Sequence, residues 1–255
     1  MSRLFLYKCF VDPLKKDLAI VIPCYNEALR LPLNTYKSFL DRKRPITLLF
    51  VNDGSTDNTL SLLHDLRTSH PESVLCLDLG TNHGKAEAVR KGIQHLITDN
   101  YQKYAYLDAD LSTSLEECIS LAQQVNSNLP FVFGSRILKI DNNIQRKWYR
   151  FLIGRIVATV ISKMLGIKVY DTQCGCKIFE KETAKVLFET EFISKWMFDV
   201  EIFFRMIKKV GKANMKVCVK EMPLQQWIDT DDSRVSLSYG FVLWLDLLKI
   251  YFRYR

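Results

Sequence analysis

The sequence lacks several features that mark common protein classes. None of its seven cysteines forms a Cys-x-x-Cys pair, which argues against a zinc site or a disulfide framework and favours a reduced, cytosolic compartment. No apolar run reaches 18 residues, so no segment is expected to span a membrane. The apolar stretch at residues 4–11 is too short for a signal peptide and has no cleavage-like site after it. Repeats, low-complexity tracts and linkers are also absent.

Negative charge is under-represented. The chain of 255 residues has 36 lysines and arginines against 28 acidic residues, a net charge of +8. This imbalance predicts an acidic partner, which could be a nucleotide, a nucleic acid or an anionic membrane surface. The basic residues do not form a recognised nucleic-acid module, so we expect no nucleic-acid partner. The length suits one large α/β domain.

Short apolar runs alternate with helix-like segments through the first half of the chain. This alternation predicts an α/β fold, a Rossmann-like and mostly parallel sheet with helices on both faces. The expected strands are residues 18–22, 47–51, 74–77, 104–107 and 131–133, and the expected helices include 27–40, 85–97 and 114–125.

The second half is less regular. We expect helices at residues 151–165 and 198–208 and a strand at 214–219. The segment 236–254 is aromatic and ends in basic residues, so it is either a core helix or a helix on a membrane surface.

Two carboxylates, Asp108 and Asp110, end the strand expected at 104–107. Hard cations such as Mg²⁺ take oxygen ligands, usually one or two carboxylates plus substrate phosphates. The alternative is a capped turn before the helix expected at 114. Polar clusters also follow the strands at 18–22 and 47–51, and ligands of such sheets bind beyond the carboxyl ends of the strands. This shared placement favours a metal site over a capped turn at Asp108 and Asp110.

Seven short motifs follow one another along the chain. They are Val-Ile-Pro-Cys-Tyr-Asn-Glu (21–27), Val-Asn-Asp-Gly-Ser-Thr-Asp (51–57), Asn-His-Gly-Lys (82–85), Asp-Ala-Asp-Leu-Ser-Thr (108–113), Gly-Ser-Arg (134–136), Asp-Thr-Gln-Cys-Gly-Cys-Lys (171–177) and Phe-Asp-Val-Glu (198–201). In this order they resemble one family, the family-2 inverting glycosyltransferases, and within it the dolichyl-phosphate and polyprenyl-phosphate β-glucosyltransferases. The Asp-Thr-Gln-Cys-Gly motif points to the lipid-phosphate branch.

The resemblance implies a GT-A fold, a nucleotide-sugar donor and a divalent cation, Mg²⁺ or Mn²⁺. It implies a nucleotide-sugar-binding half at about 16–135 and an acceptor-binding half at about 136–255. Asp108 would contact the bound nucleotide and, with Asp110, hold the metal on the diphosphate. Asp53 would accept a hydrogen bond from uracil, and Lys85 would support the nucleotide. The nucleoside pocket would be lined by Pro23, Tyr25 and Glu27.

The acceptor decides whether a catalytic base is needed. A sugar hydroxyl must lose a proton to a base, whereas a phosphate monoester, with a second pKa of about 6, is already anionic near neutral pH. A lipid phosphate therefore needs cations, and arginine forks suit phosphate oxygens. We expect Arg136 and Arg146 to bind it, with Arg150 next, and Lys139 and Lys147 to be surface charges.

The roles of several other residues at family positions are left open by the sequence. Asp171 is assigned to the catalytic site, either as a sugar contact or as a base. Asp199 and Glu201 lie two apart on an expected helix, so one could reach the site while the other is structural. Arg234 matches a late motif and could contact the diphosphate. No histidine is expected to bind metal.

These observations predict a metal-dependent hexosyltransferase that moves glucose from a UDP-sugar to a polyprenyl (dolichyl-type) phosphate. Alternatives are mannose or an N-acetylhexosamine as the sugar, a glycan hydroxyl as the acceptor, or an inactive nucleotide-sugar-binding protein. We expect the protein to lie peripherally at the cytoplasmic face of a membrane, with helix 151–165 in the interface beside basic residues that favour anionic headgroups.

Overall fold

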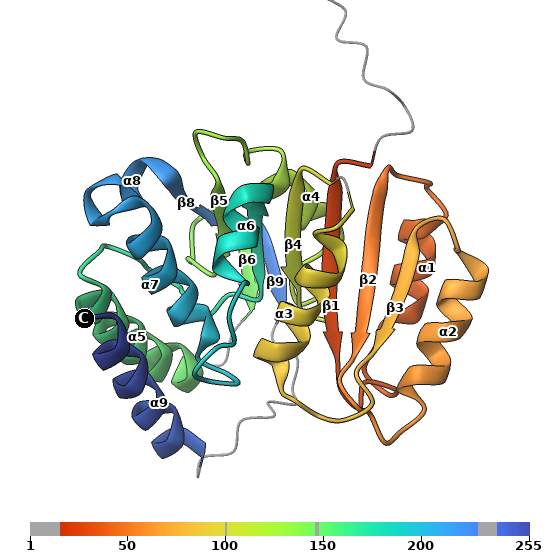
Figure 1. The fold of residues 1–255 in the computed structure, drawn as a ribbon, viewed down its shortest axis with the longest axis horizontal. Coiled ribbons are helices and arrows are strands. Elements are labelled where there is room, and N and C mark those ends of the chain that lie inside the picture. The colour runs from red at the N-terminus through yellow and green to blue at the C-terminus, as the bar shows by residue number, and fades with distance from the viewer. Residues whose placement is uncertain (1–15, 100, 146–147, 229–238) are drawn as a thin grey trace, which may run out of the picture.

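A seven-stranded sheet in the order β3-β2-β1-β4-β7-β5-β8 runs through the protein (Figure 1). The structure is a computed structural model and describes residues 16–99, 101–145, 148–228 and 239–255. The sheet strands are β1 (Leu18–Cys24), β2 (Ile46–Asn52), β3 (Val74–Asp78), β4 (Lys103–Leu107), β5 (Phe131–Ser135), β7 (Cys176–Glu180) and β8 (Val219–Pro223). A separate two-stranded ribbon pairs β6 (Asn143–Gln145) with β9 (Gln226–Ile228).

Most of the strand pairs are parallel. Strand β1 runs parallel to both β2 and β4, and β2 runs parallel to β3. Their sequences are apolar almost without interruption because both faces of the sheet are covered, and every residue of β2 is buried. The predicted α/β class and mostly parallel sheet are confirmed.

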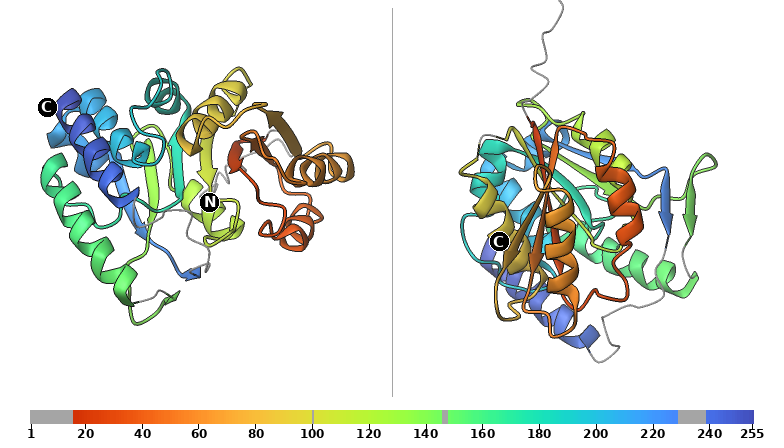
Figure 2. Two further views of the ribbon diagram at one scale, coloured as in Figure 1. Left: turned by 90° about the horizontal axis from the view of Figure 1, so that it is seen from below. Right: turned by 90° about the vertical axis from the view of Figure 1, so that its right-hand side faces the viewer.

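Helices cover both faces of the sheet (Figure 2). Alternate side chains of a strand point to opposite faces, so Ile20 packs with one core cluster and Val21 with the other. Helices α1 (Leu33–Leu40), α2 (Thr59–Ser69) and α4 (Leu115–Ala122) contribute to the first cluster. The second cluster includes α3 (Lys85–Leu96), α5 (Trp148–Leu165), α6 (Lys181–Leu187), α7 (Phe198–Val210), α8 (Met215–Cys218) and α9 (Tyr239–Tyr254).

Two predicted elements differ from the structure. The helix expected at 27–40 begins only at Leu33, because Pro32 disfavours helical geometry in the residue before it. The strand expected at 214–219 is wrong: η1 (Lys212–Asn214) and α8 occupy that segment, and β8 starts at Val219. Gly211, at φ +80°, ends α7 and turns the chain into these short helices.

Strand β7 was not expected from the sequence. It lies antiparallel between β4 and β5, where Cys176 pairs with Leu107 and Ile178 pairs with Val132. Its five residues directly follow the motif of residues 171–175, so the second half of the chain inserts a strand into the sheet of the first half.

Candidate active site

The loops that follow β1 and β2 are tied to each other at the carboxyl edge of the sheet, the lower edge in Figure 1. Ser55 Oγ accepts from the Asn26 N–H at 3.0 Å, and Thr59 Oγ1 accepts from the Glu27 N–H at 2.7 Å. Pro23 is the next-to-last residue of β1, and Tyr25 and Glu27 lie in the loop after it. The segment that carries the three residues predicted to line a nucleoside pocket is therefore tied to residues 55–59 through its Asn26 and Glu27 backbone.

Asp53 is almost completely buried, with 2% of its surface exposed. Its Oδ1 accepts from the His83 N–H and its Oδ2 from the Gly84 N–H, both at 2.8 Å. The carboxylate therefore shapes the loop that leads into α3. The hydrogen bond from uracil to Asp53 stays a prediction. Both carboxylate oxygens already accept from backbone N–H groups, so uracil would share one of these oxygens.

Lys85, the first residue of α3, lies against the first carboxylate of the predicted metal pair. Its Nζ is 2.5 Å from Asp108 Oδ1. Burial alone would lower the pKa of Lys85, but Asp108 and then Asp199 outweigh burial, and the pKa is raised. The ammonium group therefore stays charged beside Asp108 at neutral pH.

The loop after β4 is held in position by backbone and side-chain contacts. The Asp108 N–H donates to the Gly175 carbonyl at 3.1 Å, and the buried Tyr36 hydroxyl donates to the Ala109 carbonyl at 3.0 Å. Asp110 Oδ1 accepts from the Ser112 N–H at 3.0 Å, and Leu111 has a left-handed φ of +52°. The strained turn presents both carboxylates at the end of β4.

The chemistry of this loop fits a hard divalent cation. Asp108 and Asp110 supply carboxylate oxygens, the ligands that Mg²⁺ and Mn²⁺ take. Within the described residues no cluster of three or more acidic, histidine or cysteine side chains is arranged to hold a metal. A cation here would therefore complete its coordination with oxygens of a diphosphate and of water.

Gly175 makes close backbone approach to Asp108 possible. A Cβ at this position would lie 2.0 Å from Asp108 Oδ2, far inside contact distance. Beneath the same turn, the fully buried Lys177 donates to the Cys174 carbonyl at 2.7 Å and pairs with Asp199, which also accepts from the Tyr106 hydroxyl. Asp199 thus lies under the site, whereas Glu201 binds Arg205 and is structural.

The second charged group of the site is a fork between Arg136 and Asp171. Arg136 Nε donates to Asp171 Oδ2 at 2.6 Å, and Nη2 donates to Oδ1 at 2.8 Å. The Arg136 guanidinium also lies over Trp227, 5.2 Å from the ring centroid. Because the fork uses Nε and Nη2, the Nη1 corner of Arg136 faces away from Asp171.

The fork decides what Asp171 can do chemically. Burial alone would raise the pKa of Asp171, but the Arg136 guanidinium outweighs burial and holds this pKa well below its usual range. A carboxylate that binds protons so weakly is a poor general base. Its geometry is that of a group that orients Arg136.

The turn that carries Asp171 is held from two sides. Glu221, at the centre of β8, accepts from the Tyr170 N–H at 2.9 Å and from the Asp171 N–H at 2.8 Å. Arg155 on α5 donates to the Tyr170 carbonyl at 2.8 Å, and its guanidinium lies 3.6 Å from the centroid of the Tyr170 ring.

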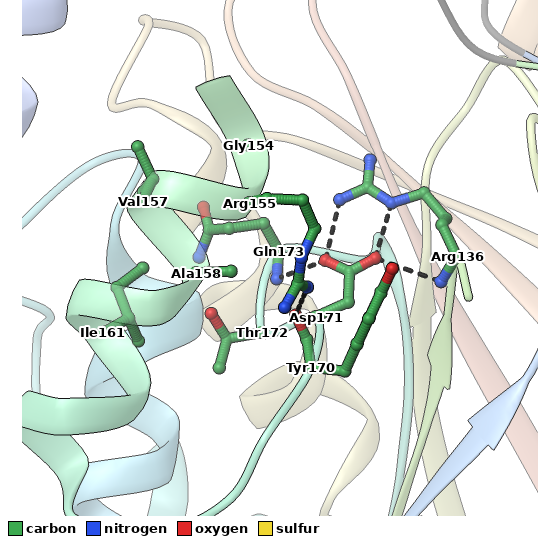
Figure 3. A pocket seen from close by; sticks show the side chains of 10 residues that line it. All are labelled: Arg136, Gly154, Arg155, Val157, Ala158, Ile161, Tyr170, Asp171, Thr172 and Gln173. Carbon is green, nitrogen blue, oxygen red and sulfur yellow. Dashed lines mark hydrogen bonds and ion pairs between the residues drawn. The ribbon is translucent and has the colours of Figure 1, made fainter. Parts of the chain in front are cut away.

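A pocket of about 200 Å³ lies between this turn and α5 (Figure 3). Its polar wall includes Arg136, Arg155 and the buried Thr172, and its apolar wall is formed by Val157, Ala158 and Ile161 of α5. Two buried polar atoms of the turn, Thr172 Oγ1 and Gln173 Nε2, have no hydrogen-bond partner within the described residues.

The structure brings together most of the predicted site residues but not all of them. Arg146 and Arg234 lie outside the described residues, as does the side chain of Arg150. Sequence reasoning did not single out Arg155 or Glu221. Arg155 was visible only as one of several basic residues, and Glu221 carried no local signal because its partners lie about fifty positions away.

Comparisons with known proteins agree with this architecture. Residues 19–188 match glycosyl transferase family 2. The dolichyl-phosphate beta-glucosyltransferase ALG5A of Trichomonas vaginalis is 31% identical over 254 residues, 94% of this chain and 74% of the relative. The dolichyl-phosphate beta-glucosyltransferase of Dictyostelium discoideum is 32% identical over 260 residues, 93% of this chain and 74% of the relative.

Solved structures with low sequence identity share the fold. Glucosyl-3-phosphoglycerate synthase from Mycobacterium tuberculosis, in complex with Mn²⁺, UDP and phosphoglyceric acid, has a TM-score of 0.66 at 13% identity, covering 92% of this chain and 78% of that chain. Mannosyl-3-phosphoglycerate synthase from Rubrobacter xylanophilus has a TM-score of 0.62 at 16% identity, covering 92% and 72%. With the match over residues 19–188, these findings show that the chain belongs to glycosyl transferase family 2 and has the GT-A fold.

Proposed function

We propose that this protein transfers glucose from UDP-glucose to a dolichyl-type polyprenyl phosphate, with inversion at the anomeric carbon, and that it requires Mg²⁺ or Mn²⁺. The chain matches two relatives named dolichyl-phosphate beta-glucosyltransferase over 74% of the length of each relative. The fold neighbour from Mycobacterium tuberculosis was solved with Mn²⁺ and UDP-glucose. Both support the choice of donor, acceptor and metal.

The observation that carries the proposal is the Arg136–Asp171 fork on the wall of an amphipathic pocket. Asp171 is ionised and bound to Arg136, so the described residues that line this pocket include no free carboxylate base. An acceptor that is already anionic needs no base. The α5 wall, with Val157 and Ile161, suits the apolar chain of such an acceptor, and Arg136 and Arg155 suit its phosphate.

In the transfer, an oxygen of the acceptor phosphate forms a bond to the anomeric carbon while the bond from that carbon to the diphosphate oxygen breaks. No proton is transferred. Lys85 and Arg30, which lies 3.7 Å from Asp110, place positive charge where the leaving diphosphate gains negative charge. A cation held by Asp108 and Asp110 would act there as a Lewis acid.

A membrane surface would deliver the acceptor beside the pocket. Apolar side chains of α5 face outward near its start, where Phe151, Leu152 and Ile156 are 38%, 55% and 57% exposed. On α9, Leu248 and Phe252 are also exposed. No helix in the part of the chain that the structure describes is long and apolar enough to cross a membrane.

A donor panel with polyprenyl phosphate and Mg²⁺ or Mn²⁺ tests the proposal. We expect a lipid-linked product from UDP-glucose and much less from GDP-mannose or UDP-N-acetylglucosamine. If lipid-linked product forms only with another donor, glucose is the wrong sugar and the sugar of that donor takes its place. Product on a free glycan but never on the lipid phosphate would overturn the proposed acceptor.

A further inference from the structure

Helix α9 carries one buried carboxylate in an otherwise apolar stretch. Asp246 is 9% exposed and sits between Leu245 and Leu247. Its Oδ2 accepts a hydrogen bond of 2.7 Å from the hydroxyl of Ser194, and its Oδ1 lies 3.4 Å from Lys249 Nζ. A carboxylate inside an apolar helix is costly unless it is hydrogen-bonded. The hydrogen bond from Ser194 is therefore what stabilises Asp246 at this position.

Ser194 belongs to the segment 188–197 between α6 and α7, which we name the strap. Ser194 is 1% exposed, and its hydroxyl oxygen accepts from the Trp196 N–H at 3.3 Å and the Met197 N–H at 3.0 Å. One hydroxyl therefore donates to α9 and orders the turn that leads into α7. At the other end of the strap, Arg205 donates to the carbonyls of Thr190 and Glu191 at 2.9 and 2.6 Å.

The strap also caps the helix that presents Lys85. The Lys195 carbonyl accepts from the Ala86 N–H at 3.1 Å, which satisfies one of the free donors in the first turn of α3. The N-cap of α3, Gly84, has no side chain to do this. A Cβ at Gly84 would lie 2.9 Å from the Lys195 side chain, so strap and helix start are in close contact.

We propose that Asp246 is a positioning residue for the donor half of the site. Through Ser194 it holds the strap so that the Lys195 carbonyl caps α3, and α3 then presents Lys85 to Asp108. The inference rests on the proposed function for the ligand that Lys85 supports. It assigns the C-terminal helix a role at the nucleotide end of the site, although the amphipathic pocket lies against α5.

Two kinds of measurement test this: amide hydrogen exchange at Ala86 and calorimetric titration with UDP and Mn²⁺. Asp246→Leu removes the acceptor for the Ser194 hydroxyl, whereas Asp246→Asn keeps an acceptor oxygen. We expect Asp246→Leu to speed exchange at Ala86 and to weaken UDP binding roughly fivefold, a coupling typical of packed networks. Asp246→Asn should restore both, and the KM for the lipid acceptor should stay unchanged.

Ile250→Val is the matched control, because it removes one buried methyl group from the packing of α9 and leaves the Ser194–Asp246 hydrogen bond in place. It should lower the melting temperature without changing UDP affinity. Ser194→Ala provides a second route if Asp246→Leu does not fold. Equal loss of UDP affinity in Ile250→Val, or normal UDP affinity in both Asp246→Leu and Ser194→Ala, would overturn the inference. Absence of UDP binding in the unaltered protein would instead refute the proposed donor, and exchange at Ala86 would still report on the strap.

Discussion

The proposed donor and acceptor halves of the site are built in different ways. Around Asp53 and Asp108 the polar groups follow the ends of parallel strands, and backbone N–H and carbonyl groups hold them. Around Arg136 and Asp171 the charges bind each other, and side chains from α5 and β8 hold their turn. The donor half is thus a set of loops shaped to receive ligands, and the acceptor half is a charge pair assembled in advance.

This difference implies different tolerances to substitution. A backbone-built loop keeps its shape when one ligand side chain is removed, so the chemistry should fail while the fold survives. Substitution in a buried charge pair should reduce both activity and stability. Removing one partner leaves the other charge uncompensated, at a cost of about 3–5 kcal/mol. Substitutions in the two halves should therefore separate loss of activity from loss of stability.

Asp110→Ala should have the largest effect on transfer. Loss of the metal's charge stabilisation, worth several kcal/mol, predicts a fall in kcat on the order of 10³-fold with little change in melting temperature. Asp78→Asn, at the end of β3 on the same sheet edge, is the control and should retain activity. Undiminished transfer by the Asp110 variant would refute the metal assignment.

Gly175→Ala tests the backbone contact to Asp108. The added Cβ would lie 2.0 Å from Oδ2, so the carboxylate must move. A displacement of about 1 Å can cost roughly 10²-fold in rate. Mn²⁺ affinity in the presence of UDP should fall together with kcat. A Cβ at Gly80 meets nothing within 4 Å, but its backbone is left-handed at φ +72°, so Gly80→Ala should lower the melting temperature and leave the Mn²⁺ affinity unchanged. Unimpaired Mn²⁺ affinity in Gly175→Ala would argue against the contact.

Asp171→Asn separates an orienting group from a base. If Asp171 orients Arg136, we expect the KM for polyprenyl phosphate to rise roughly tenfold, the KM for UDP-glucose to stay constant and the shape of the pH–rate profile to be kept. A catalytic base predicts the opposite: a collapse in kcat and loss of the acidic limb of the profile. Steady-state kinetics with each substrate varied in turn distinguishes the two.

The same pair makes stability depend on pH in a defined direction. Arg136 lowers the pKa of folded Asp171 below its unfolded value of about 3.9, so the stabilisation is fully present above about pH 4 and is lost as pH falls. Urea unfolding of the protein and of Asp171→Asn should therefore give a stability difference that shrinks below pH 4. A difference independent of pH would show that the pair is not coupled to protonation.

The smallest expected effect concerns the outward face of α5. Leu152→Ser or Ile156→Ser removes exposed apolar surface, so binding to anionic vesicles should weaken by about threefold to tenfold, as expected for about 1 kcal/mol of lost burial. Flotation measures this directly. Val186→Ser, at an exposed site on α6, is the control. Transfer to a short, water-soluble prenyl phosphate should not change in any of the three variants.

The donor half was largely predictable from the sequence because its signals are local. An apolar strand followed by Asp108 and Asp110 can be recognised within a few residues, and parallel strands bring such ends to one edge. Ser114 was also predictable as the start of α4, where its hydroxyl accepts from the Glu117 N–H. The family resemblance then assigned roles that spacing alone could not.

The acceptor half was less predictable because its contacts join distant segments. Arg136 and Asp171 were both identified as site residues, but their fork joins positions 35 apart in sequence and changes the role considered for Asp171. Strand β7 overlaps only the last two residues of the 171–177 motif, and its pairing with β4 and β5 makes it a strand. Such pairing depends on tertiary context, which strand propensity does not capture.

Strand β7 also has a consequence for how the molecule is made. During synthesis β4 leaves the ribosome long before β7, so one edge of the nascent sheet remains unpaired until residues 176–180 arrive. Unpaired edges invite association with other chains, and distant pairings fold slowly. Because the Asp108 N–H bonds to the Gly175 carbonyl, the loop that carries Asp108 and Asp110 gains its final support only when β7 docks. Nascent chains that stop short of β7 should therefore be prone to aggregation, and their loop of Asp108 and Asp110 should be incompletely supported.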